Sequence, residues 1–369
     1  MPRRIALISF LSILWLISPA QFRKYSNEFL NIGAGARGLA MGGAQIAISQ
    51  DGTSGYWNPA GLVWSGKVPD LNLMHADYFA GIAKYDFASL SLPLKESDRF
   101  LGVSLLRFAV DDIPNTLFLV EPDGSINYNN VSSFSSADYA FLLSYAQPLR
   151  KDDAVRISFG ANAKIIHRKV GSFARSWGFG LDAGLQMHAR KLHLGLMLKD
   201  VSTTYNSWIF SFTDKEKEVF YLTNNDIPVR STELTAPRAS LSGAYEFTLG
   251  THLVLMPIMD VELSFDGRRN TLLSSNGLNA DPKLGLEATY RKQFFLRAGV
   301  SNFQKALEDS DTLNQNKVWI FQPSIGAGFK INNVTIDYAF SNLANQSNPL
   351  FTHVFSLRLN LVKKEGNKP

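Results

Sequence analysis

Apolar and polar residues alternate along most of the chain from Leu71 to Val362. The pattern is clearest from Val155 to Ile165, where every second side chain is apolar and those between are polar or glycine. Such alternation predicts a β-strand whose two faces meet different solvents. The segment from Trp177 to Met187 repeats it. Both segments have the length of about ten residues that a tilted strand needs to cross a membrane.

About fourteen such segments can be counted, and an even number is typical of bacterial outer-membrane barrels. The predicted spans are 71–78, 82–92, 99–108, 135–147, 154–168, 173–188, 191–200, 236–247, 250–264, 281–292, 294–303, 318–330, 333–343 and 350–362. The long connections are 109–134, 201–235, 264–281 and 302–317. All of them fall on one rim, as a barrel with short periplasmic turns and long external loops requires. The sequence therefore predicts an all-β fold, an antiparallel transmembrane β-barrel of about 14 strands. A soluble β-sandwich or propeller is the alternative.

The stretch from Asn31 to Leu62, NIGAGARGLAMGGAQIAISQDGTSGYWNPAGL, is rich in Gly and Ala and almost without charge. Glycine gives no side-chain packing, so eight glycines here predict close backbone approach to an enclosing wall. About fourteen strands enclose a lumen that stays open unless something fills it. We expect an N-terminal Gly-rich hatch over residues 21–67, lying in the lumen of a barrel formed by residues 68–362.

The strand face assigned to the lumen is also rich in glycine, which marks places where another backbone comes close. The positions are Gly160, Gly178, Gly180, Gly184, Gly195, Gly285, Gly299, Gly326 and Gly328. Within the hatch, the aromatic residues are expected to anchor the segment and Asn58-Pro59 to set a turn. The candidate hatch positions are Gly33, Gly35, Gly38, Gly42, Gly43, Tyr56, Trp57, Asn58, Pro59 and Gly61. A direct role in ligand binding is the alternative for the aromatic group.

The ends of the chain carry an export signal and a tail. Arg3 and Arg4 precede an apolar run from Ile5 to Ile17, and Ser18-Pro19-Ala20 supplies the small residues of a cleavage site. Residues 1–20 are therefore predicted to be a signal peptide, with Gln21 as the mature start; an uncleaved anchor is the alternative. Residues 363–369 are expected to form a short basic periplasmic tail. The expected location is the outer membrane of a Gram-negative bacterium, in contact with outer-membrane lipid and lipopolysaccharide.

Composition argues against chemistry at a metal or a nucleophile. The chain has no Cys, and its net charge of +5 includes the two leader arginines, too little to indicate nucleic-acid binding. The six His are scattered without ligand spacing, so we predict no metal site. Gly33-x-Gly35-x-x-Gly38 lacks the strand, helix and acidic partner of a dinucleotide site, so no cofactor is expected. No serine-hydrolase elbow is present. We expect no catalytic residues and no enzyme; an enzyme acting on surface lipid is the weaker alternative.

The long connection 201–235 carries a group of aromatic residues around a charged stretch, DKEKE. Exposed apolar clusters of this kind mark interaction surfaces. The candidate partner-binding residues are Tyr205, Trp208, Phe210, Phe212, Phe220 and Tyr221. The alternative is that this segment folds down as a lid on the barrel mouth.

Several motifs resemble one family. FLNIGAGARGLAMGGAQIA followed by SGYWNPAGL is similar to the N-terminal hatch of the PorV/PorQ family of type IX secretion proteins, which is related to FadL-type fatty-acid transporters. DPKLGLEATYRKQFFLRAGVSNFQ, WIFQPSIGAGF and THVFSLRLNL extend the resemblance over nearly the whole mature chain. It implies a fourteen-stranded barrel with a hatch, which works beside a larger translocon barrel and binds secreted cargo through C-terminal sorting domains.

A second function stays open, a FadL-like conduit for hydrophobic small molecules. It predicts a continuous apolar pocket beneath the loops. The charged positions on the inward face predict instead a lumen crossed by salt bridges. These positions are Arg156, Lys164, Asp182, Glu287, Arg297, Asp337 and Arg358.

Overall fold

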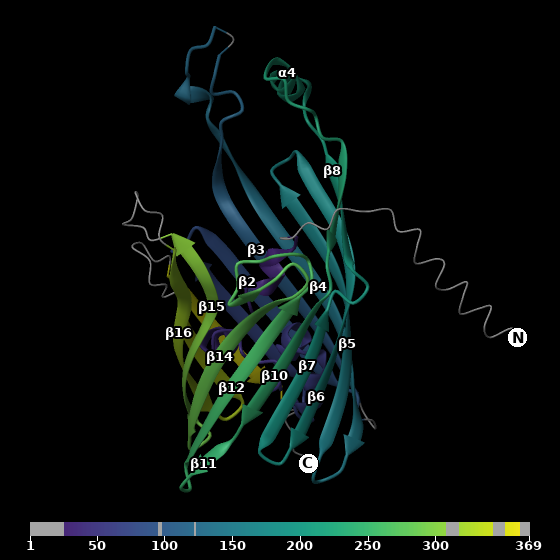
Figure 1. Cartoon of the computed structure of the whole chain (residues 1–369), viewed down its shortest axis with the longest axis vertical. Helices are drawn as coiled ribbons and strands as arrows, with labels where there is room; N and C mark the ends of the chain where they lie inside the picture. The colour runs from purple at the N-terminus through teal and green to yellow at the C-terminus, as the bar shows by residue number, and fades with distance from the viewer. Residues whose placement is uncertain (1–25, 95–97, 122, 308–316, 342–350, 362–369) are drawn as a thin grey trace, which may run out of the picture.

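The computed structural model describes residues 26–94, 98–121, 123–307, 317–341 and 351–361 (Figure 1). The predicted signal peptide, the cleavage before Gln21 and the basic tail lie outside these residues. No helix in the described part of the chain is long and apolar enough to cross a membrane.

Strands make up most of the described chain, and short helices precede and interrupt them. The helices are η2 (Glu28–Asn31), α2 (Ala36–Ala40), α3 (Ser54–Trp57), η3 (Pro59–Trp64), η4 (Tyr128–Asn130) and α4 (Asp214–Leu222). The strands are β1 (Asp70–Tyr78), β2 (Ala83–Pro93), β3 (Phe100–Asn115), β4 (Ser132–Lys151), β5 (Arg156–Val170), β6 (Ala174–Ala189), β7 (Leu192–Lys199), β8 (Thr204–Phe210), β9 (Arg230–Thr235), β10 (Arg238–Tyr245), β11 (Phe247–Leu249), β12 (Leu253–Ser264), β13 (Leu273–Ser274), β14 (Asn279–Tyr290), β15 (Phe294–Leu307), β16 (Lys317–Ile331), β17 (Val334–Ser341) and β18 (Thr352–Asn360).

The strands form one antiparallel sheet that closes on itself. β1 pairs with β2 on one side and with β18 on the other, so the first strand joins the last. The sheet contains eighteen strand segments, of which β8, β9, β11 and β13 continue or flank a neighbour, leaving fourteen around the ring. The predicted all-β barrel of about 14 strands is therefore confirmed.

Each predicted span overlaps one of the fourteen barrel strands. The prediction is wrong for 201–235, which is not a loop: β8, α4 and β9 occupy most of it. β8 continues β7 after an interruption at Asp200 and Thr203, both of which have positive φ (57° and 60°). This break hides the alternation that resumes at Thr204. Similarly, β3 and β4 run beyond the predicted connection limits, to Asn115 and from Ser132.

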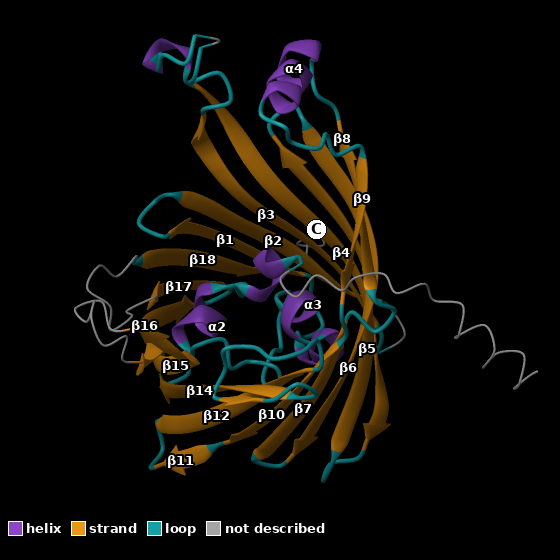
Figure 2. Ribbon diagram, turned by 45° about the horizontal axis from the view of Figure 1, so that its top comes forward, coloured by secondary structure: helices purple, strands orange, loops and turns teal. Residues whose placement is uncertain are grey.

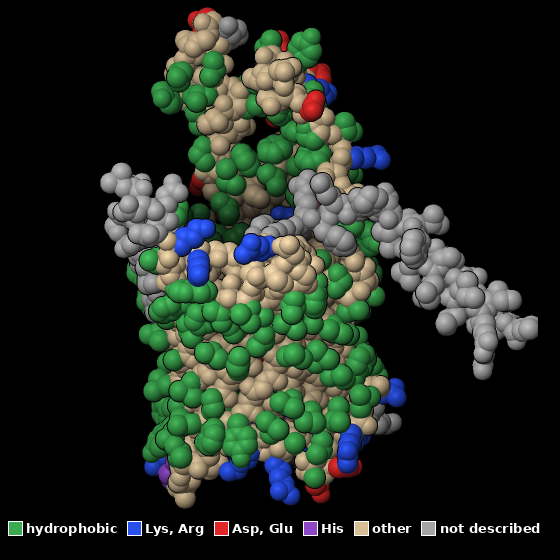
Figure 3. Space-filling view, viewed as in Figure 1, with side chains coloured by type: hydrophobic (Ala, Val, Ile, Leu, Met, Phe, Trp, Pro, Cys, Tyr) green, Lys and Arg blue, Asp and Glu red, His purple; other side chains and the backbone are tan. Residues whose placement is uncertain are grey.

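The two faces of the wall differ as the alternation predicts. Outward side chains form an apolar belt between rims that carry Lys, Arg, Asp and Glu (Figure 3). One rim, the turn rim, has short links such as Arg190–Lys191 and Arg291–Gln293. The other, the loop rim, carries the β3–β4 and β8–α4–β9 hairpins, which rise well above the barrel (Figures 1 and 3). In outer-membrane barrels the short turns are periplasmic and the long loops external.

The hatch lies inside the ring (Figure 2). Its α2 contacts β15, β16, β17 and β18, and its η3 contacts β3, β4, β5 and β6. A core of buried hydrophobic residues joins Phe29, Tyr56 and Trp57 of the hatch to Tyr85 and Leu106 of the wall. The lumen is therefore filled at the level of the hatch.

Candidate functional site

The hatch packs against the wall at glycines. A Cβ at position 195 would lie 2.9 Å from the Cα of Ala47. A Cβ at position 160 would overlap the backbone of Pro59, and one at position 299 would overlap the backbone of Met41. The expectation that inward glycines mark close backbone approach is confirmed at these three positions.

The remaining inward glycines fall into two groups. Gly184 and Gly285 face hatch residues, and Gly326 faces the Ala40 side chain of the hatch. The expectation is wrong for Gly178, Gly180 and Gly328. Their nearest atoms belong to Asn206, Thr204 and Asp337 on the neighbouring strands. There glycine makes room for an inward polar side chain of the wall itself.

The segment Tyr56-Trp57-Asn58-Pro59 is buried, and its polar atoms are used within the protein. Tyr56 Oη donates to Leu30 O at 2.7 Å and accepts from Gly33 N at 2.8 Å, while Trp57 Nε1 donates to Ala34 O at 2.7 Å. Both aromatic residues thus bind α3 to the backbone of residues 30–34.

Asn58 joins the hatch to the wall. Its Nδ2 donates to Leu185 O on β6 at 3.0 Å, and its Oδ1 accepts from Ala60 N at 3.2 Å. Gly61 follows within η3, where a Cβ would overlap the Ser49 carbonyl oxygen. The other hatch glycines serve the turns: Gly33, Gly35, Gly42 and Gly43 all have positive φ, and Gly38 lies against the Trp57 ring.

Polar wall side chains bind the hatch backbone from all around the ring. Asp260 Oδ2 accepts from Gln45 N at 2.9 Å and from Ile46 N at 3.1 Å. Ser356 Oγ accepts from Ala36 N at 2.7 Å, and Asn162 Nδ2 donates to Gly55 O at 2.7 Å. These bonds satisfy buried backbone groups that the short hatch helices leave open.

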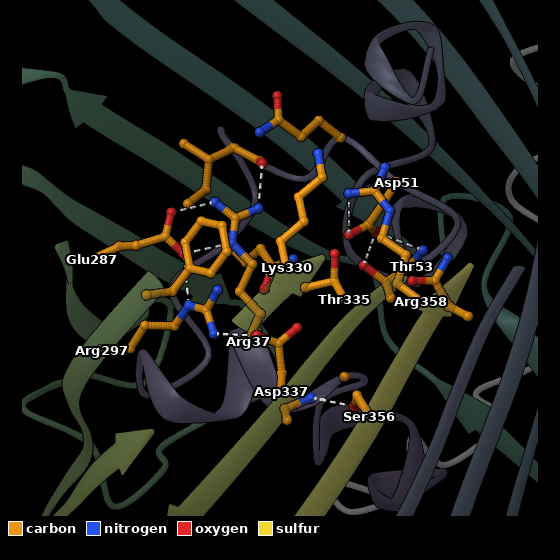
Figure 4. Close-up of a pocket in the computed structure, with 18 of the residues that line it drawn as sticks. Arg37, Asp51, Thr53, Glu287, Arg297, Lys330, Thr335, Asp337, Ser356 and Arg358 are labelled. Atoms are coloured by element: carbon orange, nitrogen blue, oxygen red, sulfur yellow. Dashed lines mark hydrogen bonds and ion pairs between the residues drawn. The ribbon is translucent and has the colours of Figure 1, made fainter. Parts of the chain in front are cut away.

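Ion pairs connect the hatch to the wall at Glu28, Arg37 and Asp51, and Figure 4 shows the network around Arg37. Arg37 on α2 makes two bonds to Glu287 on β14, Nε to Oε2 at 2.8 Å and Nη2 to Oε1 at 2.9 Å. Glu287 also accepts from Arg297 Nε at 2.6 Å, and Arg297 Nη1 reaches Asp337 Oδ1 at 2.6 Å. Burial alone would lower the pKa of Arg37, but Glu287 raises it above its usual value, so this guanidinium stays charged.

A second buried network lies in the wall at the strand interruption. Lys164 Nζ contacts Asp182 Oδ1 at 2.7 Å and Asp200 Oδ1 at 2.6 Å. Asp200 N also donates to Asp182 Oδ1 at 2.8 Å, so the interruption brings Asp200 into the lumen. The predicted salt-bridged lumen is therefore confirmed. Of the remaining inward charges, Arg358 pairs with Asp70 at 2.5 Å, and Arg156 stacks on Trp64 at 5.3 Å.

Two of the cavities in the lumen lie on opposite sides of the hatch. The inner cavity, about 390 Å³, is lined by residues beside the turn rim, such as Lys292 and Lys330, and by Arg37 of α2 (Figure 4). The outer cavity, about 340 Å³, is lined by residues near the loop rim, such as Tyr78 and Ser341. Gly38 of α2 lines the first and Leu39 lines the second. The helix therefore separates the two cavities.

The outer cavity combines aromatic surface with an unpaired cation. Arg238 and Lys283 both pair with Glu262, at 3.2 and 3.3 Å. Lys199 Nζ instead lies 5.4 Å from the centre of the Tyr56 ring, and in the described part of the chain it forms no ion pair.

The structure separates the candidate partner-binding residues. Tyr205 faces outward from β8 and is exposed, whereas Trp208 is buried on the inward face with Arg168 at 5.1 Å above its ring. Phe210 stacks on Phe212 at a ring distance of 6.4 Å, and Phe220 meets Phe212 edge to face at 4.9 Å. Only Tyr221, at 83% exposed, projects from α4 into solvent. The hairpin rises away from the mouth, so it does not cover it as a lid (Figure 1).

In the residues that the structure describes, no group of three or more His, Asp or Glu is arranged to hold a metal ion.

The sequence matches no known family model and no curated protein. Solved structures do resemble it in fold. The Ralstonia pickettii toluene transporter TbuX has a TM-score of 0.55 and 12% identity over 89% of this chain and 99% of its own. The Pseudomonas putida toluene transporter TodX has a TM-score of 0.55 and 14% identity over 89% and 98%. A Pseudomonas aeruginosa FadL homologue has 0.51 and 13% over 89% and 98%.

The chain therefore shares the β-barrel fold of these two toluene transporters and of the FadL homologue. At such low identity the likeness concerns the fold alone, and function has to be argued from the site.

Proposed function

We propose that this protein is an outer-membrane transport barrel for small molecules that combine an apolar body with an acidic group. The observation that carries the proposal is the pair of cavities on either side of α2. The hatch is held by hydrogen bonds, ion pairs and apolar packing, so it is able to shift without breaking a covalent bond. A shift of α2 would join the outer cavity to the inner one.

The outer cavity supports this choice of substrate. Tyr56, Trp57 and Leu39 supply apolar surface, and Lys199 supplies a cation without a carboxylate partner. A purely hydrophobic molecule would leave the Lys199 ammonium without an ion pair. An organic acid would pair its carboxylate with the Lys199 ammonium and place its apolar body against the aromatic surface. The structural neighbours TbuX and TodX are toluene transporters, which supports transport of apolar molecules by this fold.

A matched pair of probes tests the proposal. Octanoate and octanol have the same chain and differ in charge, and any ligand that prefers the folded state raises its melting temperature. Octanoate is expected to raise the melting temperature of the detergent-purified protein more than octanol does. Lys199→Met should remove this difference, whereas Lys217→Met, an exposed change on α4, should keep it. If neither compound shifts the wild-type melting temperature, the transport proposal fails.

A second candidate is an accessory barrel of the type IX secretion machinery that binds a larger translocon barrel and secreted cargo. The sequence resemblance supports it, and so do the exposed apolar side chains of the two raised hairpins. These are Val120, Ile126 and Tyr128 on the β3–β4 hairpin and Tyr221, Leu222 and Val229 on the other. In this proposal, export occurs through a signal peptide that is cleaved before Gln21.

Purification from native outer membranes distinguishes the candidates. A secretion component should bring a translocon barrel or proteins with C-terminal sorting domains with it in mild detergent, as identified by mass spectrometry. The double variant Tyr128→Ser/Tyr221→Ser should lose them, and Tyr145→Ser on the barrel wall should keep them. Isolation of the protein alone would reject this second candidate.

A further inference from the structure

Three cations form a row on the outward face just below the loop rim. Lys169 on β5 lies opposite Arg175 on β6, which lies opposite Ile209 on β8, which lies opposite Arg230 on β9. All three cationic side chains are exposed. They therefore share one outward surface that crosses four neighbouring strands.

Nothing in the described chain neutralises this row. The nearby carboxylates Asp138 and Glu233 point inward, where they pair with Arg168 at 2.9 and 3.6 Å. Lys169 and Arg175 are directly opposed across the ladder, and like charges in that position destabilise a sheet. An unbalanced cationic pair in a cross-strand position is favourable only when an anion lies between the two side chains.

A cavity of about 610 Å³ is lined by two of these cations and by residues of β5, β6 and β8. Its lining includes Lys169, Arg175, Trp177 and Ile209. Trp177 is 57% exposed, and its ring stacks on His167 at 4.2 Å. The cavity thus has a cationic edge toward the rim and an aromatic and aliphatic side below it.

The row also lies at a defined height in the membrane. Below Arg175, the outward positions of β6 are apolar down to the turn rim: Trp177, Phe179, Leu181, Ala183, Leu185 and Met187. Aromatic residues mark the level of the lipid headgroups at both ends of such a belt. The cations directly above Trp177 are therefore at headgroup level on the external side.

We propose that the surface formed by Lys169, Arg175, Arg230 and the adjoining cavity binds a phosphate-bearing glycolipid of the outer leaflet. The lipid phosphate bridges Lys169 and Arg175, and an acyl chain lies against Trp177 and Ile209. Lys and Arg are the side chains that pair best with phosphate oxygens. The site is on the outside of the wall and is independent of the lumen and of either proposed function.

The test uses the full-length protein in nanodiscs of phosphatidylcholine with a fixed fraction of diphosphoryl lipid A, or of its dephosphorylated form. Native mass spectrometry counts the lipid A retained after release from the nanodisc. Wild type is expected to retain the diphosphoryl form. Lys169→Gln/Arg175→Gln should weaken retention on the order of tenfold, because each basic residue near an anionic headgroup contributes independently. The control Arg190→Gln/Lys191→Gln removes two cations from the opposite rim and should retain lipid A as wild type does.

Retention of both lipid A forms to the same extent would overturn the proposal, because binding would then not depend on phosphate. Equal retention by the rim variant and wild type would also overturn it. A third arm adds inorganic phosphate to the lipid-loaded protein. Displacement of lipid A by millimolar phosphate would show a site for free phosphate and would reject a lipid site.

Discussion

Gly160 of β5 and Pro59 of the hatch are in direct backbone contact, with no space for a side chain at position 160. The contact is one of several that let an irregular segment fill a regular barrel. At these glycine positions the wall has no space for a larger side chain, and each position can be tested by a single substitution.

Gly160→Ala should destabilise the protein by about 1–3 kcal/mol, the usual cost of adding a methyl group to a fully packed site. Thermal unfolding in detergent, followed by circular dichroism, measures the loss. Gly243→Ala is the matched control, because a Cβ at position 243 meets only Leu194 Cδ2, at 3.6 Å. Equal melting temperatures for the two variants would contradict the close packing at Gly160.

Arg37→Gln should loosen the hatch. The Arg37 and Glu287 side chains are 14% and 5% exposed, and removal of one partner of a buried ion pair costs about 3–5 kcal/mol. Hydrogen exchange at residues 36–57 should become faster while the barrel strands stay protected. Arg150→Gln removes an exposed pair with Asp152, which contributes about 0–1 kcal/mol, and should leave the hatch unchanged. Unchanged hatch exchange in Arg37→Gln would show that the ion pair does not hold it.

Deletion of residues 31–62 should open the lumen. About fourteen strands enclose an interior wider than wall side chains alone fill, so single-channel conductance in planar bilayers should rise. Deletion of α4, which stands above the rim, is the control and should not change conductance. A hatch deletion that conducts no better than wild type would mean that other segments close the pore.

Because Tyr56 is buried in the hatch, the free energy of unfolding should decrease at alkaline pH. Burial raises the pKa of the Tyr56 phenol above its usual value of about 10, because the ionised form would lose water. Above about pH 10, Tyr56 is therefore ionised in the unfolded state and still protonated in the folded state. The contribution of Tyr56 is therefore complete below about pH 10 and decreases as pH rises beyond it.

Melting temperatures between pH 8 and pH 11.5 measure this effect. Tyr56→Phe should be less stable than wild type at pH 8, by about 1–3 kcal/mol, because Gly33 N and Leu30 O lose their partner. The difference between the two proteins should narrow above pH 10. A constant difference across the range would show that Tyr56 ionises equally in both states.

The barrel could be predicted because each strand lies between two solvents, and this leaves a period of two in segments such as Arg156–Val170. β8 was missed because Asp200 and Thr203 interrupt the period and the charged turn of α4 follows. The alternation within a short segment cannot show that a strand resumes after such an interruption.

The candidate site was only partly predictable. Arg37 and Asp51 are the only ionic residues between Asn31 and Leu62, and Glu287, Arg297 and Asp337 stand on the predicted inward face. These positions indicate that a charged side chain of the hatch pairs with a charged side chain of the wall. The pairing of Arg37 with Glu287 depends on the depth and rotation of the hatch in the ring, which no local pattern encodes. The unpaired Lys199 and the two cavities depend on the same placement.

The hydrogen bonds of the hatch backbone also imply an order of assembly. Gln45 N, Ala36 N and Gly55 O bond to side chains of β12, β18 and β5, which come from distant parts of the chain. The segment that is made early in the chain therefore gains its full set of partners only after strands from the middle and the end of the chain are in place. Until then these backbone groups have no partner in the wall. The many Gly and Ala residues of this segment limit the apolar surface that it offers to aggregation while it waits.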